Sequence, residues 1–133
     1  VVVAGKGVGE VKLGDSAENV RQAWGDPAPG PNSASLWYGD DNTHNLVAVV
    51  DLGAENKVSK ITVYKPQFAV SGSPVLKVGA TKKAILDEMV NITGKRPEEL
   101  SGMSDYPGAG ICFHFDHSEL CSGISIRRPG TSL

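Results

Sequence analysis

"KLGDSAENVRQAW" (residues 12–24) returns in altered form as "KVGATKKAILDEM" (residues 77–89), 65 positions further along the chain. In both stretches a glycine precedes a hydroxyl residue, Ser16 or Thr81, and an apolar stripe with helical spacing follows. A serine or threonine there can cap a helix, because its side-chain oxygen accepts an unpaired backbone N–H of the first turn. We therefore predict two helices, one from Ser16 to Gly25 and one from Thr81 to Gly94.

Two further blocks repeat in the same order. "LVAVVD" (46–51) lines up with "ICFHFD" (111–116), and "SKITVYKP" (59–66) lines up with "SGISIRRP" (122–129). The blocks have the alternation and the β-branched or aromatic composition of strands. The repetition predicts an α+β fold of two tandem repeats, each a helix followed by an antiparallel β-meander, with the helices packed on one sheet face.

The same patterns predict the limits of the elements and of the units. The expected strands are 35–38, 46–51 and 58–64 in the first repeat, and 103–106, 110–115 and 120–127 in the second. The expected divisions are a flexible lead-in over 1–9, a first repeat over 10–66, a linker over 67–74 and a second repeat over 75–133. We expect both repeats to form one compact unit.

Alternation along the predicted strands assigns side chains to two faces. The face toward the helices is predicted to carry Ile111, Phe113, Phe115, Ile124 and Ile126, with Leu46, Ala48, Val50, Ile61 and Val63 in the first repeat. The other face, called the outer face below, is predicted to carry Val47, Val49, Thr62, Tyr64, Cys112, His114, Ser125 and Arg127. Such a mixed surface is either partly covered by a loop or binds something.

Composition and charge exclude several classes of function. The chain has 133 residues, 40% hydrophobic and 21% charged, which is typical of a globular protein. Its net charge of −2 supplies no overall positive field for nucleic acid. No apolar run reaches the roughly 18 residues of a membrane helix. The glycine-rich "GKGVGEVKLGDS" (5–16) has no phosphate-loop spacing, and Asp15 stands where such a loop needs a lysine.

The two cysteines are predicted to form a disulfide. A two-residue turn at Asp116 and His117 pairs Phe113 with Leu120 and places Cys112 opposite Cys121. Counting from the turn, the cysteines fall on a non-hydrogen-bonded pair, where a bridge is geometrically allowed. A bridge implies an oxidising, secreted or periplasmic compartment, and two free thiols in a cytosolic protein are the alternative.

We expect neither a metal site nor a catalytic one. His114, Asp116 and His117, with His44, do not have an established zinc spacing, and strand geometry makes His114 and His117 diverge. The sequence has serines and histidines but no nucleophile elbow, the strained turn that exposes a catalytic serine. The expectation is a protein that is not an enzyme and uses no cofactor.

Aromatic residues indicate a binding surface instead. Trp37 and Tyr38 are adjacent on one predicted strand, so alternation places them on opposite faces. Trp, Tyr and Arg are the residue types that dominate binding hot spots. The candidate partner-binding residues are Trp37, Tyr38, Tyr64, His114 and Arg127. The alternative is that the aromatic residues pack beneath the loops 26–34 or 66–74.

The order of motifs resembles that of known secreted domains. "G-V-G-x-V-x-L-G", a helix, a Gly-x-Pro break, an aromatic-rich strand and a hairpin ending in "KVSKITV" resemble repeat domains of the β-lactamase-inhibitor-protein type. The same layout is similar to the small outer-membrane assembly lipoproteins of the BamE type. The resemblance to the inhibitors implies tandem sheets with a concave surface that grips a partner protein.

These observations together favour a secreted or periplasmic protein-binding module, with inhibitor or immunity function as a sub-case. The expected partner is another protein, recognised by the outer face. The alternatives are a binding protein for a small ligand or envelope glycan, with its pocket between the repeats, and a hydrolase of unfamiliar geometry.

Overall fold

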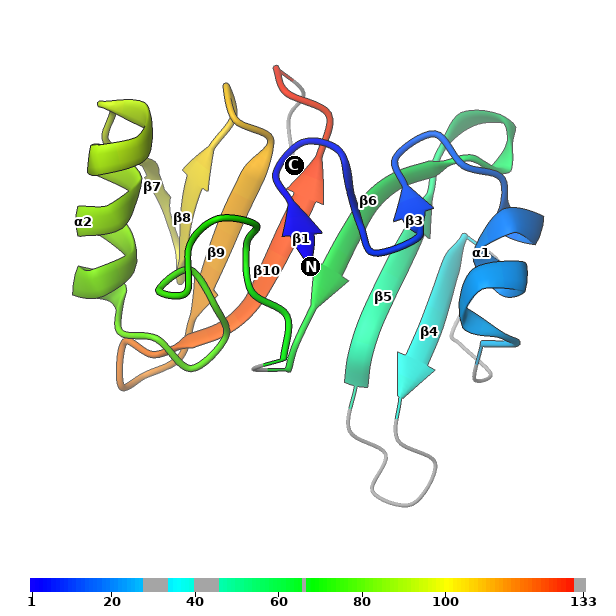
Figure 1. Ribbon diagram of the computed structural model, residues 1–133, viewed down its shortest axis with the longest axis horizontal. Coiled ribbons are helices and arrows are strands. Elements are labelled where there is room, and N and C mark those ends of the chain that lie inside the picture. Colours follow the sequence, from blue (N-terminus) through cyan, green and yellow to red (C-terminus); the bar gives the residue numbers. More distant parts are fainter. Residues whose placement is uncertain (28–33, 40–45, 66, 131–133) are drawn as a thin grey trace.

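The structure is a computed structural model that describes residues 1–27, 34–39, 46–65 and 67–130 (Figure 1). Its main feature is a seven-stranded antiparallel sheet with the order β4-β5-β6-β10-β9-β8-β7. Together with two helices, this sheet confirms the α+β class. The strands in sheet order are β4 (Ser35–Gly39), β5 (Leu46–Leu52), β6 (Val58–Val63), β10 (Cys121–Arg127), β9 (Ile111–Phe115), β8 (Met103–Tyr106) and β7 (Glu98–Leu100). The sequence predicted all of these strands except β7.

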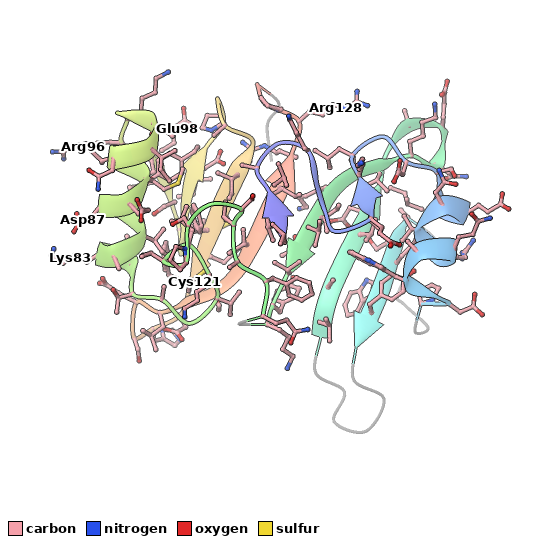
Figure 2. All side chains as sticks on the ribbon, in the orientation of Figure 1. Lys83, Asp87, Arg96, Glu98, Cys121 and Arg128 are labelled. Atoms are coloured by element: carbon pink, nitrogen blue, oxygen red, sulfur yellow. The ribbon has the colours of Figure 1, made fainter. Side chains whose placement is uncertain are left out.

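Both predicted helices are confirmed, together with their caps. Helix α1 (Ala17–Trp24) begins after Ser16, whose side chain accepts the backbone N–H of Asn19, and ends at Gly25. Helix α2 (Lys82–Thr93) begins after Thr81, whose hydroxyl accepts the N–H of Ala84, and ends at Gly94 in the left-handed conformation. The outer side of α2 is solvated, and Figure 2 shows its Lys83 and Asp87 projecting away from the sheet.

The N-terminal segment corrects the expectation of a flexible lead-in over residues 1–9. It forms a small three-stranded sheet of β1 (Val2–Val3), β2 (Gly7–Val8) and β3 (Val11–Lys12), in front of the large sheet in Figure 1. Its strands bury the side chains of Val2, Val8 and Val11 completely or nearly so. The backbone packs tightly as well, because a Cβ on Gly110 would lie 2.8 Å from the Cα of Gly5. The sequence did not predict these strands, because two residues are too few to show the alternation of a strand.

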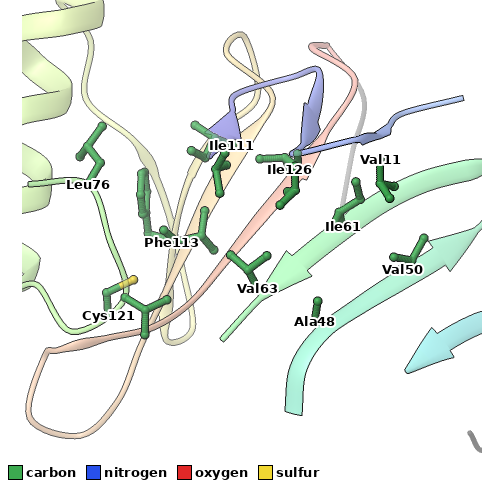
Figure 3. Packing of buried hydrophobic residues seen from close by; sticks show 14 of the residues in the cluster. Val11, Ala48, Val50, Ile61, Val63, Leu76, Ile111, Phe113, Cys121 and Ile126 are labelled. Carbon is green, nitrogen blue, oxygen red and sulfur yellow. The ribbon is translucent and has the colours of Figure 1, made fainter. Parts of the chain in front are cut away.

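One hydrophobic core lies between the large sheet, the helices and the small sheet (Figure 3). The predicted inward residues Ile111, Phe113, Ile124 and Ile126 belong to this core, whereas the buried outer residues Val49 and Cys112 do not, which confirms the assignment of faces. Ala48, Val50, Ile61 and Val63 are buried in the same cluster, and Phe115 packs against it while half-buried. Val20 of α1 and Ile85 and Met89 of α2 complete this core. The side chain of Leu46 lies outside the described residues.

The hairpin between β9 and β10 differs from the expected two-residue turn. The connection runs from Asp116 to Leu120, and the Asp116 carboxylate accepts the backbone N–H groups of Ser118 and Leu120 at 2.9 and 3.0 Å. Glu119 adopts a positive φ of 58° within this loop. A register shift between Cys121 and Gly123 follows at the start of β10. The longer loop changes every cross-strand partner that the sequence predicted.

The disulfide prediction is therefore wrong. Phe113 pairs with Ile124, and Cys112 pairs with Ser125 rather than with Cys121. Cys121 belongs to the core cluster on the helix side, whereas Cys112 alternates with Phe113 and points to the outer face. Both thiols are free and buried. Because the cysteines point to opposite faces of the sheet, they cannot be bridged without moving the backbone.

Candidate functional site

The outer face of the large sheet is the candidate site, because the helices and the small sheet pack on the other side. Strand pairing arranges one row of outer side chains across the sheet, from the edge strand β4 to β8. In order, the row consists of Trp37, Val49, Thr62, Ser125, Cys112 and Asp105. Small side chains occupy the middle of the row, so larger neighbours can shield them from solvent.

A chain of hydrogen bonds runs through the middle of this face. Thr62 Oγ1 lies 2.7 Å from Ser125 Oγ, and Ser125 Oγ lies 2.7 Å from His114 Nε2. Burial lowers the pKa of His114, and the positive charge of Lys60 lowers it further. The imidazole is therefore neutral at pH 7, with one nitrogen available to accept a hydrogen bond.

A serine hydroxyl beside a neutral imidazole is also the first part of a catalytic dyad. Here, however, Ser125 is only 1% exposed, and its hydroxyl is shared between Thr62 and His114. A nucleophile must reach its substrate, and this hydroxyl lies below the surface. In this conformation the hydrogen bond between Ser125 and His114 holds these two side chains in place on the sheet.

An ion pair lies beside this chain on the outer face. The Arg127 guanidinium donates two hydrogen bonds to the Asp105 carboxylate, at 2.7 and 2.8 Å. The side chains are only 3% and 5% exposed, respectively. Such a planar, bidentate pair holds both groups in one orientation. Arg127 thus lies on the predicted face, but its head group is buried against Asp105 rather than extended into solvent.

Cys112 lies between these two polar groups. Burial raises the pKa of its thiol to about 11, with an added effect of the Asp105 charge that Arg127 and Lys60 oppose. Burial likewise raises the pKa of Cys121 to about 12. Because the thiolate is the reactive form, we expect both protonated thiols to react slowly at neutral pH.

The predicted aromatic residues divide between the two faces. Trp37 lies on the outer face opposite Val49, whereas Tyr38 lies on the helix face opposite Ala48. Tyr64 follows β6 and stands against Gly123, where a Cβ would come within 3.3 Å of its ring. The structure therefore brings Trp37, Tyr64, His114 and Arg127 to one face and separates Tyr38 from them.

The Trp37 indole is the least satisfied polar group of this face. Its Nε1 is buried and has no hydrogen-bond partner among the residues that the structure describes. A buried N–H without a partner costs about 1–3 kcal/mol.

Sequence reasoning missed a polar cluster at one end of the outer face. Ser35 Oγ donates to Asp51 at 2.7 Å, and Lys60 Nζ lies 3.7 Å from the same carboxylate. Beside them is a hollow of about 580 Å³ that Arg127 and Arg128 also line. Asp105 was missed too, because nothing in its neighbourhood along the chain identifies Arg127, 22 residues away, as its partner.

Metal-ligating groups do not gather anywhere in the described part of the chain. In residues 1–27, 34–39, 46–65 and 67–130, no three His, Cys, Asp or Glu side chains lie close enough to hold an ion. His44, part of the metal alternative, lies outside these residues. Neither described helix is long and apolar enough to cross a bilayer.

No family model matches this chain, and no curated protein matches it in sequence. Solved structures do share its fold. The uncharacterized protein YfeY from Escherichia coli is 16% identical, with a TM-score of 0.62 over 96% of this chain and 100% of that one. An extracellular protein containing an SCP domain, from Bacillus anthracis, is 14% identical, with a TM-score of 0.55 over 89% of this chain and 44% of that one.

A third similar structure is the DUF4309 family protein YjgB from Bacillus subtilis. It is 13% identical, with a TM-score of 0.54 over 86% of this chain and 78% of that one. At such identities the likeness concerns the fold alone. The resemblance to inhibitor-type and BamE-type domains stays a prediction.

Proposed function

We propose that this protein is a binding module that recognises another protein through the outer face of its seven-stranded sheet. The observation that carries the proposal is the pair of half-buried aromatic side chains, Trp37 and Tyr64, that strand pairing brings to that face. Trp is also the side chain most enriched at the centres of protein interfaces.

The neighbouring side chains suit the same role. Tyr64 and His114 are half-buried around a middle made of small, hydrogen-bonded residues. Burial raises the pKa of Tyr64, and the charge of Asp51 adds to that effect, so its hydroxyl stays protonated and able to donate. The Arg127–Asp105 pair holds the surface in one shape, which lowers the entropy lost on binding.

We also infer that the chain consists of two copies of one unit. The backbone N–H of Gly14 donates to the Val58 carbonyl at 2.8 Å, and Gly79 donates to Cys121 at the same distance. The pairing Ala48–Val63 recurs as Ile111–Ile126, a displacement of 63 residues in both strands. The block 59–66 already aligns with 122–129 at 63, so only β5 and β9 change from the displacement of 65, and Asp51 then matches His114 instead of Asp116.

The same displacement makes Thr62 the counterpart of Ser125, and these two residues pair across β6 and β10. Such self-pairing is what a pseudo-twofold axis at the centre of the sheet produces. Both copies would then contribute equally to the outer face. This arrangement supports a binding surface that spans the two copies.

For the compartment we propose a secreted or periplasmic location. The supporting observation is that one of the solved structures with this fold is described as an extracellular protein. Because both cysteines are free thiols, a disulfide no longer supports this location. Fractionation of the native host with an antibody against the chain tests the location.

The binding role is tested by capture from envelope extract, followed by reconstitution with the purified partner. We expect the Trp37→Ala, Tyr64→Ala double variant to lose binding, since both side chains stand on the outer face. The matched control is the Lys83→Ala, Val90→Ala double variant, which alters exposed residues of α2. Unchanged affinity in the outer-face variant, with the fold intact by circular dichroism, would exclude this face.

A further inference from the structure

A second candidate site lies on the helix side of the large sheet, away from the outer face. It is a cavity of about 410 Å³ where the end of α1, the strands β4 and β5 and the segment after β6 meet. Its size is within the range of about 300–1,000 Å³ typical of small-molecule sites. The residues that line it include Trp24, Asp26, Tyr38, Ala48 and Phe68.

Aromatic rings form much of the wall. Trp24 and Tyr38 pack edge to face, with ring centroids 5.5 Å apart and an interplanar angle of 85°. The Tyr38 hydroxyl donates to the Gly25 carbonyl at 2.9 Å, which ties β4 to the end of α1. Phe68 comes from the segment that follows β6. All three rings are half-buried, so part of each is accessible from the cavity.

The one charged side chain among these lining residues is acidic. Asp26 is exposed, and among the described residues no side chain forms an ion pair with it. Its charge does reach the aromatic wall. The pKa of Tyr38 is raised mainly by burial, the positive charge of Arg21 opposes that rise, and the charge of Asp26 adds to it by a smaller amount. Arg21 is not a lining residue.

We propose that this cavity binds a small quaternary or alkylated ammonium compound. The alkyl groups on the ammonium nitrogen would lie against Trp24, Tyr38 and Phe68, and the positive charge would lie near Asp26. Aromatic faces attract cations through the ring quadrupole, and a nearby carboxylate adds a direct charge interaction. A metal ion would keep its hydration shell and gain little from the rings, whereas a neutral apolar molecule would gain nothing from Asp26.

The test uses the intrinsic fluorescence of Trp24. The chain has two tryptophans, so a Trp37→Phe background leaves Trp24 as the single reporter. The probes are choline and its neutral analogue of similar shape, 3,3-dimethylbutan-1-ol. We expect a saturable change with choline and an affinity for the neutral analogue that is at least about fivefold lower.

Two variants separate the contributions of charge and rings. Asp26→Asn should weaken choline binding about fivefold and leave the neutral analogue unaffected, because only the charge interaction is lost. Phe68→Leu should weaken choline binding about threefold. The control is Glu18→Gln, which removes the same charge from an exposed position of α1 outside the cavity.

Three results would overturn the proposal. These are a lack of saturable binding of choline, equal affinity for both probes, and an Asp26→Asn variant that behaves like Glu18→Gln. Thermal unfolding of each variant confirms that the protein is folded during the titration. Because Asp26 is exposed, its neutralisation should leave the fold intact.

Discussion

Thr62 Oγ1 and Ser125 Oγ lie 2.7 Å apart at the centre of the seven-stranded sheet, where β6 pairs with β10. Ser125 continues the contact to His114 at the same distance. The middle of the outer face is therefore polar and buried, yet its polar atoms are paired with one another. Buried networks of this kind are stable only while every member keeps a partner.

Replacing Ser125 with alanine should therefore destabilise the fold. The change leaves Thr62 and His114 without their shared partner, and an unsatisfied buried group costs about 1–3 kcal/mol. Urea denaturation measures the free energy of unfolding. Adding Thr62→Val should cost less than the sum of the single changes, because it removes one of the two orphaned groups. Strict additivity would contradict this coupling.

Removing either partner of the Arg127–Asp105 pair alone should strongly destabilise the fold. Asp105→Asn removes the carboxylate charge with which the buried guanidinium pairs, and breaking such a pair typically costs about 3–5 kcal/mol. The matched control is Asp87→Asn, which breaks an exposed pair with Lys83 and should cost below about 1 kcal/mol. Denaturant titration compares the two, and similar losses would contradict the assigned burial.

Both cysteines should be present as protected thiols. We expect the intact mass of the unreduced protein to match two free thiols, and a thiol reagent at pH 8 to react slowly with the native protein. The reason is burial, which raises the pKa values to about 11 for Cys112 and about 12 for Cys121. Denatured protein should react fully and quickly. A mass lower by two hydrogens would instead show a disulfide.

His114 should make stability fall as the solution is acidified. Its pKa in the folded protein is lowered, chiefly by burial. The unfolded chain then binds a proton more readily, so the stabilisation is complete above the unfolded pKa of about 6.5 and is lost as pH falls through the folded pKa. Urea denaturation between pH 8 and 5.5 measures this slope. His114→Gln should reduce it, and an unchanged slope would argue against a buried imidazole.

Much of the fold was predictable because its signals are local. Ser16 and Thr81 cap their helices, and Gly25 and Gly94 end them, through contacts within a few residues. Alternation identified the inward side chains around Phe113, because successive residues of a strand point to opposite faces and only one face packs against the core. These features depend on helical and strand periodicity, which the order of residues shows directly.

The candidate sites were less predictable, because they depend on contacts between distant residues. Trp37 and Tyr38 were expected on opposite faces, but strand pairing had to show which of them joins Tyr64. The cavity near Asp26 could not be predicted from the sequence, because its walls come from separate elements. No local pattern marks Trp24, Tyr38 and Phe68 as neighbours.

The sequence by itself determined the α+β class, the two capped helices and the inward face of the sheet. Tertiary structure alone decided the register of β9 against β10, the separation of Cys112 from Cys121 and the meeting of Asp105 with Arg127. The physical reason is that a hairpin register depends on the length and conformation of its loop. The backbone hydrogen bonds that the Asp116 carboxylate accepts there shift every partner beyond the turn.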